Sequence, residues 1–304
     1  MNLKENSISS KILTGKNVLL RVDFNVPLKG SELLDDERLV RALPTIKYIL
    51  KEAKSLKILT HLGRPEETNL IQDRFSLKPV ANRLSELLGE EVGLAASLKD
   101  LESQVGIAML ENIRFFKGEK NNDKALSKAL SDLADIFVMD AFGTSHRKQA
   151  STYGITEFIN EACVGLLVEE ELSALEKIVS SPTKPLLGII GGSKISTKMK
   201  VIDSLTKHVD HLIIGGALAN TCFKALDKNI GKSLYEEEFV PLAKKIVNHP
   251  KIVLPEYVMV SKGLDSEPLE KNINDLDDDD IIYDVGNESV ENFGSYIDLS
   301  LIHI

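Results

Sequence analysis

The sequence predicts an α/β protein with two halves, each a mostly parallel sheet covered by helices on both faces. Short apolar runs of strand length alternate with helix-like segments along most of the chain, which is typical of such sheets. A charged helical segment, Leu166–Ser181, lies between the two alternating regions. The length of 304 residues is enough for about two domains. We therefore expect domains at residues 1–165 and 182–304, joined by a hinge helix at 166–181.

The first half contains apolar runs that predict four strands, at Val18–Phe24, Leu56–Thr60, Gly106–Leu110 and Ile136–Met139. Helical patterns separate them, at residues 37–53, 77–88 and 122–135. Pro44 lies inside the first helix and predicts a kink, and Gly89 ends the second.

Polar and cationic residues follow the ends of these predicted strands. Asp23 and Asn25 follow the first strand, and they suit hydrogen bonds to hydroxyl groups of a ligand. Cationic side chains gather near the other strand ends or the next helix start: Arg38, His61, Arg64, Arg114, His146 and Arg147. Because ligands of open α/β sheets bind at the carboxyl ends of the strands, the set predicts a pocket for an anionic ligand. For any single arginine, a solvated or ion-paired surface position is the alternative.

The second half repeats the alternation, starting with an unusual stretch, Leu186–Lys200. An apolar run meets Gly191 and Gly192, and Lys194 and Lys198 follow at the start of an expected helix. A glycine turn before a helix N-terminus is suited to phosphate, although an ordinary strand-to-helix turn remains the alternative. The spacing is not that of a P-loop, because Ser193 and Ile195 stand where glycine and a hydroxyl residue are needed.

A second IIGG sequence ends at Gly215 and Gly216, and Ala217 begins an expected helix to Ala225. This turn lacks lysines, so it suits backbone approach to a flat ring, with tight packing of strand on helix as the alternative. A further helix is expected at 235–248, and strands at 252–254 and 281–283. The acidic run 277–280 is expected to be a solvated turn rather than a metal site.

Composition narrows the classes of function. The net charge of −9 disfavours a general nucleic-acid binder. The 2 cysteines form no disulfide framework, and no apolar run has the length of a signal sequence core or a membrane span. We expect a cytoplasmic protein in which any anion-binding site is a local concentration of Arg and Lys on an acidic body.

Six segments in this order resemble phosphoglycerate kinases: VLLRVDFNVPL, HLGRP, LENIRFFKGE, MDAFGTSHR, GGSKISTKMKVI and IIGGALANTCF. The resemblance implies two doubly wound, Rossmann-like domains that close to transfer a phosphoryl group between 1,3-bisphosphoglycerate and ADP, giving 3-phosphoglycerate and ATP with Mg²⁺. It also implies a monomer that binds neither nucleic acid nor membrane. The rival hypotheses are a P-loop NTPase, which the failed spacing disfavours, and a remnant that binds 3-phosphoglycerate or a partner without turnover.

The resemblance also implies roles for matching residues. The glycerate hydroxyl and carboxyl end would be held by Asp23 and Asn25, and the carboxylate and phosphate by His61, Arg64, Arg114 and Arg147. Arg38 would bind substrate and stabilise the transferring phosphoryl group together with Lys194. The nucleotide phosphates would contact Lys194, Lys198, Gly191 and Gly192, and the adenine pocket would be lined by Gly215, Gly216 and Ala217. No magnesium ligand is assigned.

The sequence departs from the family at three places. Thr197 stands at a usually acidic position, and Asn287 follows Gly286 where the family has proline. The last ten residues, SYIDLSLIHI, do not resemble the family's continuation. We therefore expect a C-terminally truncated chain with an incomplete second domain and impaired turnover.

Overall fold

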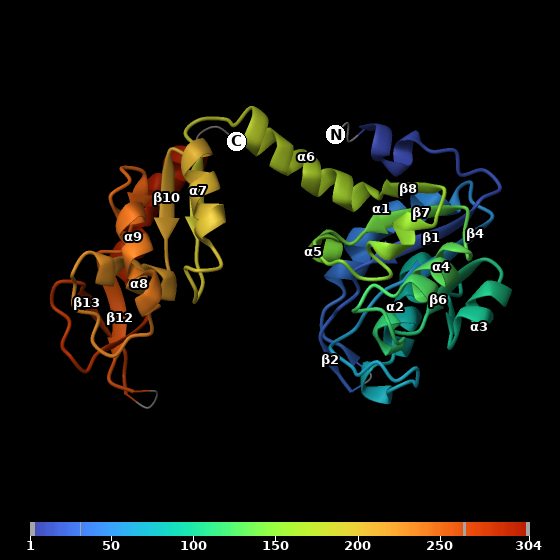
Figure 1. Cartoon of the computed structure of the whole chain (residues 1–304), viewed down its shortest axis with the longest axis horizontal. Coiled ribbons are helices and arrows are strands. Elements are labelled where there is room, and N and C mark those ends of the chain that lie inside the picture. The colour runs from blue at the N-terminus through green and yellow to red at the C-terminus, as the bar shows by residue number, and fades with distance from the viewer. Residues whose placement is uncertain (1–3, 31, 264–265, 302–304) are drawn as a thin grey trace. The chain divides into compact units, whose positions relative to one another are not determined.

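The computed structural model describes residues 4–30, 32–263 and 266–301. The chain folds into two compact units, Met1–Leu175 and Glu176–Ile304. Both combine helices with parallel strands (Figure 1), so the predicted α/β class is confirmed. None of the helices in the described ranges has the length and apolar character needed to cross a membrane.

Unit 1 contains a six-stranded parallel sheet in the order β5-β6-β4-β1-β7-β8. Its strands are β1 (Asn17–Val22), β4 (Ser55–Leu59), β5 (Gly93–Ala95), β6 (Ile107–Leu110), β7 (Ile136–Asp140) and β8 (Glu161–Val164). A short hairpin is formed by β2 (Leu28–Lys29) and β3 (Glu32–Leu33). The helices are α1 (Glu37–Leu50), α2 (Lys78–Leu88), α3 (Leu98–Ser103), α4 (Lys124–Ser131), α5 (Phe142–Ser145) and α6 (Leu166–Ser180).

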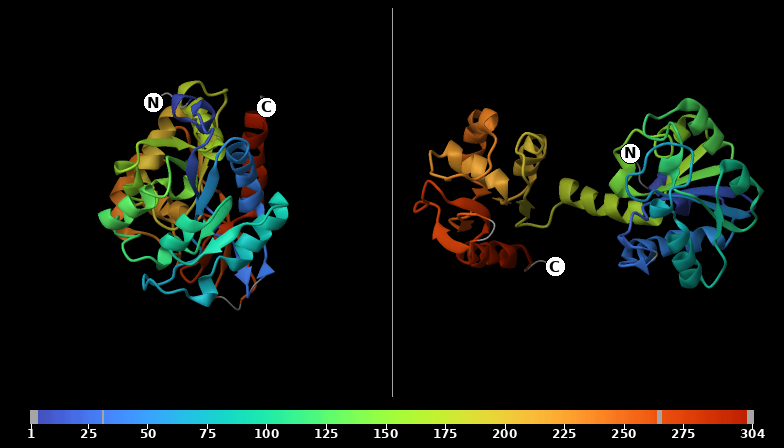
Figure 2. Two further views of the ribbon diagram at one scale, coloured as in Figure 1. Left: turned by 90° about the vertical axis from the view of Figure 1, so that its right-hand side faces the viewer. Right: turned by 90° about the horizontal axis from the view of Figure 1, so that it is seen from below.

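The sheet of unit 1 is buried on both faces, as the nearly continuous apolar strands predict. Val18 and Leu20 of β1 belong to one core cluster, which includes buried residues of α1 and α2. Leu19 points to the opposite face and joins a second cluster with residues of α3 and α4. Helices therefore cover both faces (Figure 2), and the carboxyl ends of the strands share one edge.

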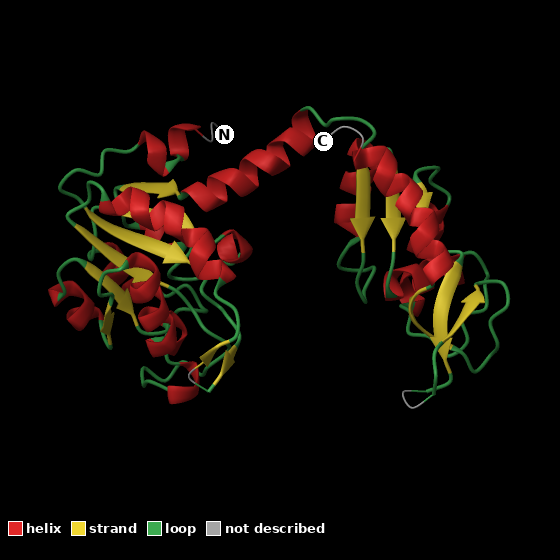
Figure 3. Cartoon of the chain, turned by 180° about the vertical axis from the view of Figure 1, so that it is seen from behind, coloured by secondary structure: helices red, strands yellow, loops and turns green. Residues whose placement is uncertain are grey.

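Unit 2 contains two small sheets. The parallel sheet has the order β11-β10-β9, and the antiparallel sheet has the order β13-β12-β14. The strands are β9 (Leu187–Ile190), β10 (His211–Ile214), β11 (Ile252–Val253), β12 (Tyr257–Ser261), β13 (Leu269–Asn272) and β14 (Ile281–Val285). The helices are α7 (Met199–His208), α8 (Ala217–Ala225), α9 (Val240–Val247) and α10 (Asn287–Leu301). Figure 3 shows the strands and helices by colour.

Helix α8 belongs to both cores of unit 2. Its residues Leu218 and Cys222 pack in the cluster of the parallel sheet. Ala219 and Phe223 pack with Val258 of β12 in the second cluster. This helix is therefore the element that fixes the antiparallel sheet against the rest of the unit.

Several expected boundaries are corrected by the structure. The helix expected at 122–135 begins at Lys124, because Asp123 accepts a hydrogen bond from Leu126 N as the N-cap. The helix expected at 235–248 is a 3₁₀ turn, Glu237–Phe239, followed by α9, in whose first turn Pro241 lies. Helix α1 continues through Pro44.

The strand expected at 281–283 is β14 of the antiparallel sheet rather than part of a parallel one. Alternation of strands and helices alone could not show this, because β12, β13 and β14 follow one another without helices between them. Of the final ten residues, 295–301 belong to α10 and the last three lie outside the described residues.

Candidate functional site

The end of β1 carries the first two predicted site residues of unit 1. Arg38, in the first turn of α1, donates from Nη1 to Asp23 Oδ2. Asp23 Oδ1 accepts from the backbone N–H of Asn25 at 3.3 Å, and Asn25 Oδ1 accepts from Gly63 N at 2.8 Å. Asp23 and Arg38 line a cavity of about 430 Å³ that also includes Phe142 and Gly143, which follow β7. The structure thus brings residues from three strand ends together.

His61 lies just beyond β4 and is only 3% exposed. Its Nδ1 atom is 3.3 Å from Arg21 Nη2 and 3.8 Å from Asp23 Oδ1. Because a guanidinium can only donate, Nδ1 accepts in this contact, and the proton of the neutral ring is on Nε2. The pKa of His61 is lowered to about 2, mainly by burial. The positive charges of Arg21, Arg114, Arg147 and Arg38 lower it further.

Arg21 is a buried residue of this region that the sequence analysis did not single out. It is 1% exposed and its Nε donates to Ser151 Oγ at 3.1 Å. Ser151 Oγ donates in turn to Glu119 Oε1 at 2.6 Å, and Ser151 N donates to Glu119 Oε2 at 2.9 Å. Burial raises the pKa of Glu119, and the positive charge of Arg21 opposes that rise. An arginine inside an otherwise apolar strand was the signal available in the sequence.

The end of β6 places Arg114 in the same region. Its side chain is 8% exposed and donates to Gly63 O. Asn112 fixes the turn, because its Oδ1 accepts from Leu62 N and Arg114 N while its Nδ2 donates to Leu62 O. Burial and then the nearby charge of Arg147 lower the pKa of Arg114, and Arg64 acts in the same direction.

The charges that act on the pKa values of His61 and Arg114 come from one group of residues, which comprises predicted residues of unit 1 and Arg21. We call it the cationic cluster, and its members are Arg21, Asp23, Arg38, His61, Arg64, Arg114 and Arg147. His146 is exposed at the C-cap of α5. Guanidinium groups bind carboxylates and phosphates through paired N–H donors. The cluster is thus suited to a small ligand that carries both groups.

The two glycine turns of unit 2 lie against each other. A Cβ on Gly216, whose φ is +64°, would be 3.0 Å from Gly192 O. Leu218 N donates to that same oxygen at 3.0 Å. The absence of a side chain at Gly216 is therefore needed for packing of backbone on backbone.

The expected helix after Gly192 begins later than predicted. Helix α7 starts at Met199, and Lys198 is the residue before it. Lys194 lies in the preceding loop, where Ser196 donates to Glu236 from N at 2.9 Å and from Oγ at 2.7 Å. Both lysine side chains are exposed. The turn is thus anchored by Ser196, and the lysines are free to meet an anion in solvent.

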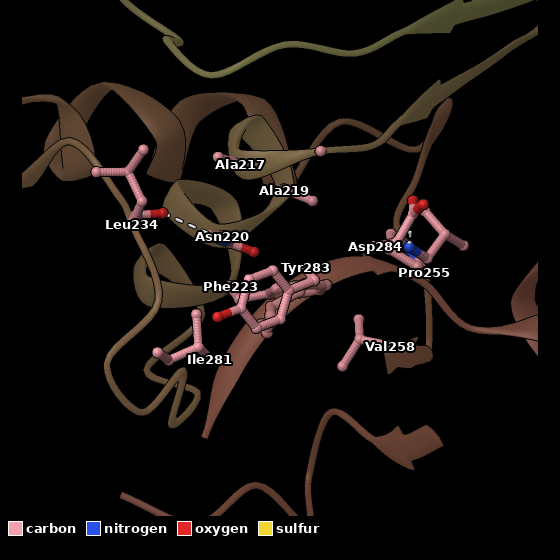
Figure 4. A pocket seen from close by; sticks show the side chains of 13 residues that line it. Ala217, Ala219, Asn220, Phe223, Leu234, Pro255, Val258, Ile281, Tyr283 and Asp284 are labelled. Carbon is pink, nitrogen blue, oxygen red and sulfur yellow. Dashed lines mark hydrogen bonds between the residues drawn. The ribbon is translucent and has the colours of Figure 1, made fainter. Parts of the chain in front are cut away.

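Beside the second glycine turn lies a cavity of about 260 Å³. Figure 4 shows its walls, which come from α8, β12 and β14. Its lining residues are Gly216, Ala217, Ala219, Asn220, Phe223, Leu234, Pro255, Val258, Ile281, Ile282, Tyr283, Asp284 and Val285. Gly215 is not among these described lining residues, and a Cβ there would contact Val285 Cγ2 at 3.7 Å. The mostly apolar walls suit a flat ring.

The acidic run 277–280 is exposed at Asp277 and Asp278, as expected of a solvated turn, whereas Asp280 is buried. Lys271 Nζ is 2.8 Å from Asp277 and 2.7 Å from the buried Asp280, and Lys262 Nζ is 3.0 Å from Asp279. Within the described ranges, these three aspartates are the one group whose oxygens could converge on a metal ion. Each of the three is paired with a lysine, so a Mg²⁺ ion would have to displace these lysines to bind there.

Comparison with known proteins agrees with this architecture. The family model for phosphoglycerate kinase matches residues 8–301. The phosphoglycerate kinase of Vibrio campbellii is 45% identical over 281 residues, which cover 91% of this chain and 72% of that protein. That of Francisella philomiragia is 44% identical over 294 residues, covering 94% and 75%.

Solved structures give the same result. Phosphoglycerate kinase from Coxiella burnetii matches with a TM-score of 0.82 and 40% identity, over 96% of this chain and 76% of that one. The enzyme from Pyrococcus horikoshii matches with a TM-score of 0.79 and 26% identity, over 96% and 78%. The matched residues include both units and all of the segments on which the resemblance was based. The chain therefore belongs to the phosphoglycerate kinase family.

Proposed function

We propose that the cationic cluster of unit 1 is the 3-phosphoglycerate site of a phosphoglycerate kinase. The family reaction transfers a phosphoryl group reversibly between 1,3-bisphosphoglycerate and ADP, giving 3-phosphoglycerate and ATP. The observation that carries the proposal is the cluster itself. Buried Arg114 and neutral His61 stand beside exposed Arg64 and half-buried Arg147, so donors and charge are in place before a ligand arrives.

Within this site, Asp23 and Asn25 would hold the glycerate hydroxyl and carboxyl end. His61, Arg64, Arg114 and Arg147 would bind the carboxylate and the phosphate. A neutral His61 with its proton on Nε2 can donate to a carboxylate oxygen without adding another positive charge.

Arg38 and Lys194 would act on the transferring phosphoryl group. Phosphoryl transfer requires mainly positioning and charge stabilisation, so cations without an obvious general base suit the chemistry. Arg38 is half exposed and held by Asp23, which leaves its remaining N–H donors available. Removing a group that acts only in the transition state lowers kcat more than it raises KM.

Unit 2 would bind the nucleotide. Lys194, Lys198 and the turn at Gly191–Gly192 would contact its phosphates, and Gly216 and Ala217 would lie beside the adenine ring. Gly215 would shape the turn without reaching the ring. Since the described aspartate cluster is held by lysines, we propose that Mg²⁺ enters on the nucleotide's own phosphate oxygens.

The proposed organisation is a cytoplasmic monomer with domains at 1–165 and 182–304 and a hinge helix at 166–181. The boundary between the two compact units lies inside this helix, between Leu175 and Glu176. Its N-terminus is fixed in unit 1, because Asp140 Oδ1 accepts from Val168 N at 3.0 Å.

Calorimetric titration of the chain with 3-phosphoglycerate tests whether the cationic cluster binds this ligand. Saturable binding is expected, and Arg64→Ala should weaken it, whereas absence of binding would overturn the assignment.

A coupled assay with 3-phosphoglycerate and ATP tests the reaction. In that assay, Arg38→Ala should lower kcat more than it raises KM, and a change in KM alone would make Arg38 a binding residue only.

A further inference from the structure

The carboxylate of Glu236 holds the loop that carries Lys194. This loop comprises residues 193–198, and we call it the lysine loop. Glu236 Oε2 accepts from Ser196 N at 2.9 Å, and Glu236 Oε1 accepts from Ser196 Oγ at 2.7 Å. The two residues are 40 positions apart in the sequence. Both oxygens of one carboxylate are therefore engaged with a single residue of the lysine loop.

Glu236 is itself attached to helix α8. Its backbone N–H group donates to Thr221 Oγ1 at 3.1 Å, and Thr221 is fully buried. Two residues earlier, Leu234 O accepts from Asn220 Nδ2 at 3.0 Å, which is the dashed line in Figure 4. Two hydrogen bonds therefore fix this segment on α8, and the carboxylate at its end connects α8 to the lysine loop.

Two kinds of contact hold the lysine loop. Ile195 is 0% exposed and packs in the core of the parallel sheet. Apolar packing is non-directional, whereas a hydrogen bond to a carboxylate requires a narrow range of geometries. The bonds to Glu236 therefore fix the orientation of the backbone beside Ile195, from which the exposed Lys194 and Lys198 extend.

Charge gives Glu236 a second effect, which opposes the first. Burial raises the pKa of Glu236, but hydrogen bonds from Ser196 and the positive charge of Lys194 outweigh burial, so this pKa is lowered. The carboxylate is thus ionised at neutral pH. A negative charge beside lysines that bind phosphate weakens that binding, because like charges repel. The hydrogen bonds and the charge of Glu236 therefore change nucleotide binding in opposite directions.

We propose that Glu236 is a positioning residue, which holds the lysine loop on α8 so that Lys194 and Lys198 meet the phosphates of a nucleotide. The inference rests on the proposed nucleotide site of unit 2 and names the group that orders its cations. Side chains and loops that become ordered only on binding reduce affinity, and a loop that is ordered beforehand avoids this cost. Glu236 thus strengthens phosphate binding without contacting the phosphates.

The test measures the dissociation constants of ADP and of adenosine, which lacks the phosphates, on the full 304-residue chain. Calorimetry at low salt is suited to ADP, and titration followed by NMR chemical shifts is suited to adenosine. Glu236→Ala should weaken ADP binding about two- to fivefold and leave adenosine binding unchanged. Equal weakening of both ligands would mean that the substitution only damages unit 2, and it would overturn the proposal.

The conservative variant Glu236→Gln separates geometry from charge. Its amide oxygen can accept from Ser196 N, and its amide nitrogen can donate to Ser196 Oγ, so both contacts survive without the charge. ADP should bind to this variant at least as tightly as to the wild-type chain. A loss equal to that of Glu236→Ala would overturn positioning through these hydrogen bonds. The matched control is Glu238→Ala, which removes the same charge at an exposed position and should not weaken ADP binding.

A double-mutant cycle tests whether Glu236 acts through the lysines. In a chain that carries Lys194→Gln and Lys198→Gln, Glu236→Ala should cause no further loss of ADP binding, because coupled residues are not additive. The same loss in this background as in the wild-type chain would show that Glu236 acts by another route.

The outcomes separate the two proposals. If the wild-type chain binds neither ADP nor adenosine, the nucleotide site of unit 2 is wrong, and the role of Glu236 with it. If the wild-type chain binds ADP and Glu236→Ala binds it equally or more tightly, only the role of Glu236 is wrong. Ser196→Ala removes one of the two donors from the half-buried loop residue and should show part of the same selective loss. This variant decides the question if Glu236→Ala does not fold.

Discussion

Units 1 and 2 both place their proposed ligands at the carboxyl ends of parallel strands, but they prepare these places differently. In unit 1, Arg21, Arg114 and His61 are buried, and protein groups hold each of them. In unit 2, Lys194 and Lys198 are exposed, and the buried part of the site is an apolar cavity. Buried charges must be stabilised before the ligand arrives, whereas exposed lysines can remain hydrated.

The difference follows from the two ligands. A small acid with a carboxylate and a phosphate has little apolar surface, so its site must supply charge and donors in fixed geometry. A nucleotide brings a flat base, and burial of that base supplies free energy without fixed cations. The comparison predicts that mutations in unit 1 affect stability and binding strongly, while mutations of the unit 2 lysines have small effects.

The largest expected effect is on stability, from Glu119→Gln. Of the two carboxylates whose negative charge acts on buried Arg21, Glu119 has the larger effect and Asp23 the smaller. Removal of the Glu119 carboxylate should therefore cost about 3 kcal/mol of unfolding free energy in unit 1. Chemical denaturation with hydrogen exchange of the β1 amides would measure it. Glu86→Gln is the control, because Glu86 pairs with Arg83 on the surface. Equal stability of the two variants would show that the buried network does not compensate Arg21.

The next largest effect is on binding of 3-phosphoglycerate, from Arg114→Met. Methionine retains much of the buried volume but removes the charge and the donors. Loss of one charged hydrogen bond costs roughly 1.5–3 kcal/mol, on the order of 10- to 150-fold in the dissociation constant. Lys128→Met on α4 removes the same charge from a surface pair with Asp132. The assignment of the cationic cluster would be wrong if both variants bound the acid alike.

A third prediction concerns the pH dependence of unit 1. The pKa of His61 is lowered to about 2 in the folded protein, against about 6.5 for a free histidine. Between these two values the unfolded chain therefore binds more protons than the folded chain. The contribution of His61 to the free energy of unfolding is fully present above pH 6.5 and is lost as the pH falls below it. The slope from His61 should approach about 1.4 kcal/mol per pH unit below pH 6.

His61→Gln should flatten the stability curve of unit 1 between pH 6.5 and pH 4, measured by denaturation at a series of pH values. The same substitution at the exposed His146 is the control. An unchanged slope in His61→Gln would show that this ring accepts a proton without loss of stability.

The sequence predicted the parts of the fold that follow from local pattern. The strand β1 and the polar residues Asp23 and Asn25 after it were visible, because an apolar run ends where the polar residues begin. Helix α8 was predicted with its bounds, since a glycine turn precedes it and apolar residues recur along it. The domain boundaries and the roles of site residues stay predictions.

Other features depend on contacts between distant segments, which a single sequence does not contain. Arg21 and Ser151 are 130 positions apart, and the link to Glu119 exists only after the sheet has formed. The antiparallel pairing of β12 with β14 and the ion pairs of Asp277 and Asp280 with Lys271 are of the same kind. The Oδ1 atom of Asn220, which has no hydrogen-bond partner among the described residues, likewise depends on the folded environment of α8.

The smallest expected effect belongs to the lysines of unit 2. Lys194→Gln and Lys198→Gln should each weaken ADP binding only about 1.4- to 5-fold at low salt, because exposed charge pairs contribute about 0.2–1 kcal/mol. The screening length falls from about 10 Å at 0.1 M salt to about 3 Å at 1 M. Both effects should therefore vanish at 1 M salt, while the loss caused by Arg114→Met should persist, since Arg114 itself is buried. Titrations at the two salt concentrations measure this, and a lysine effect that survives 1 M salt would mean that the lysines become buried around the bound nucleotide.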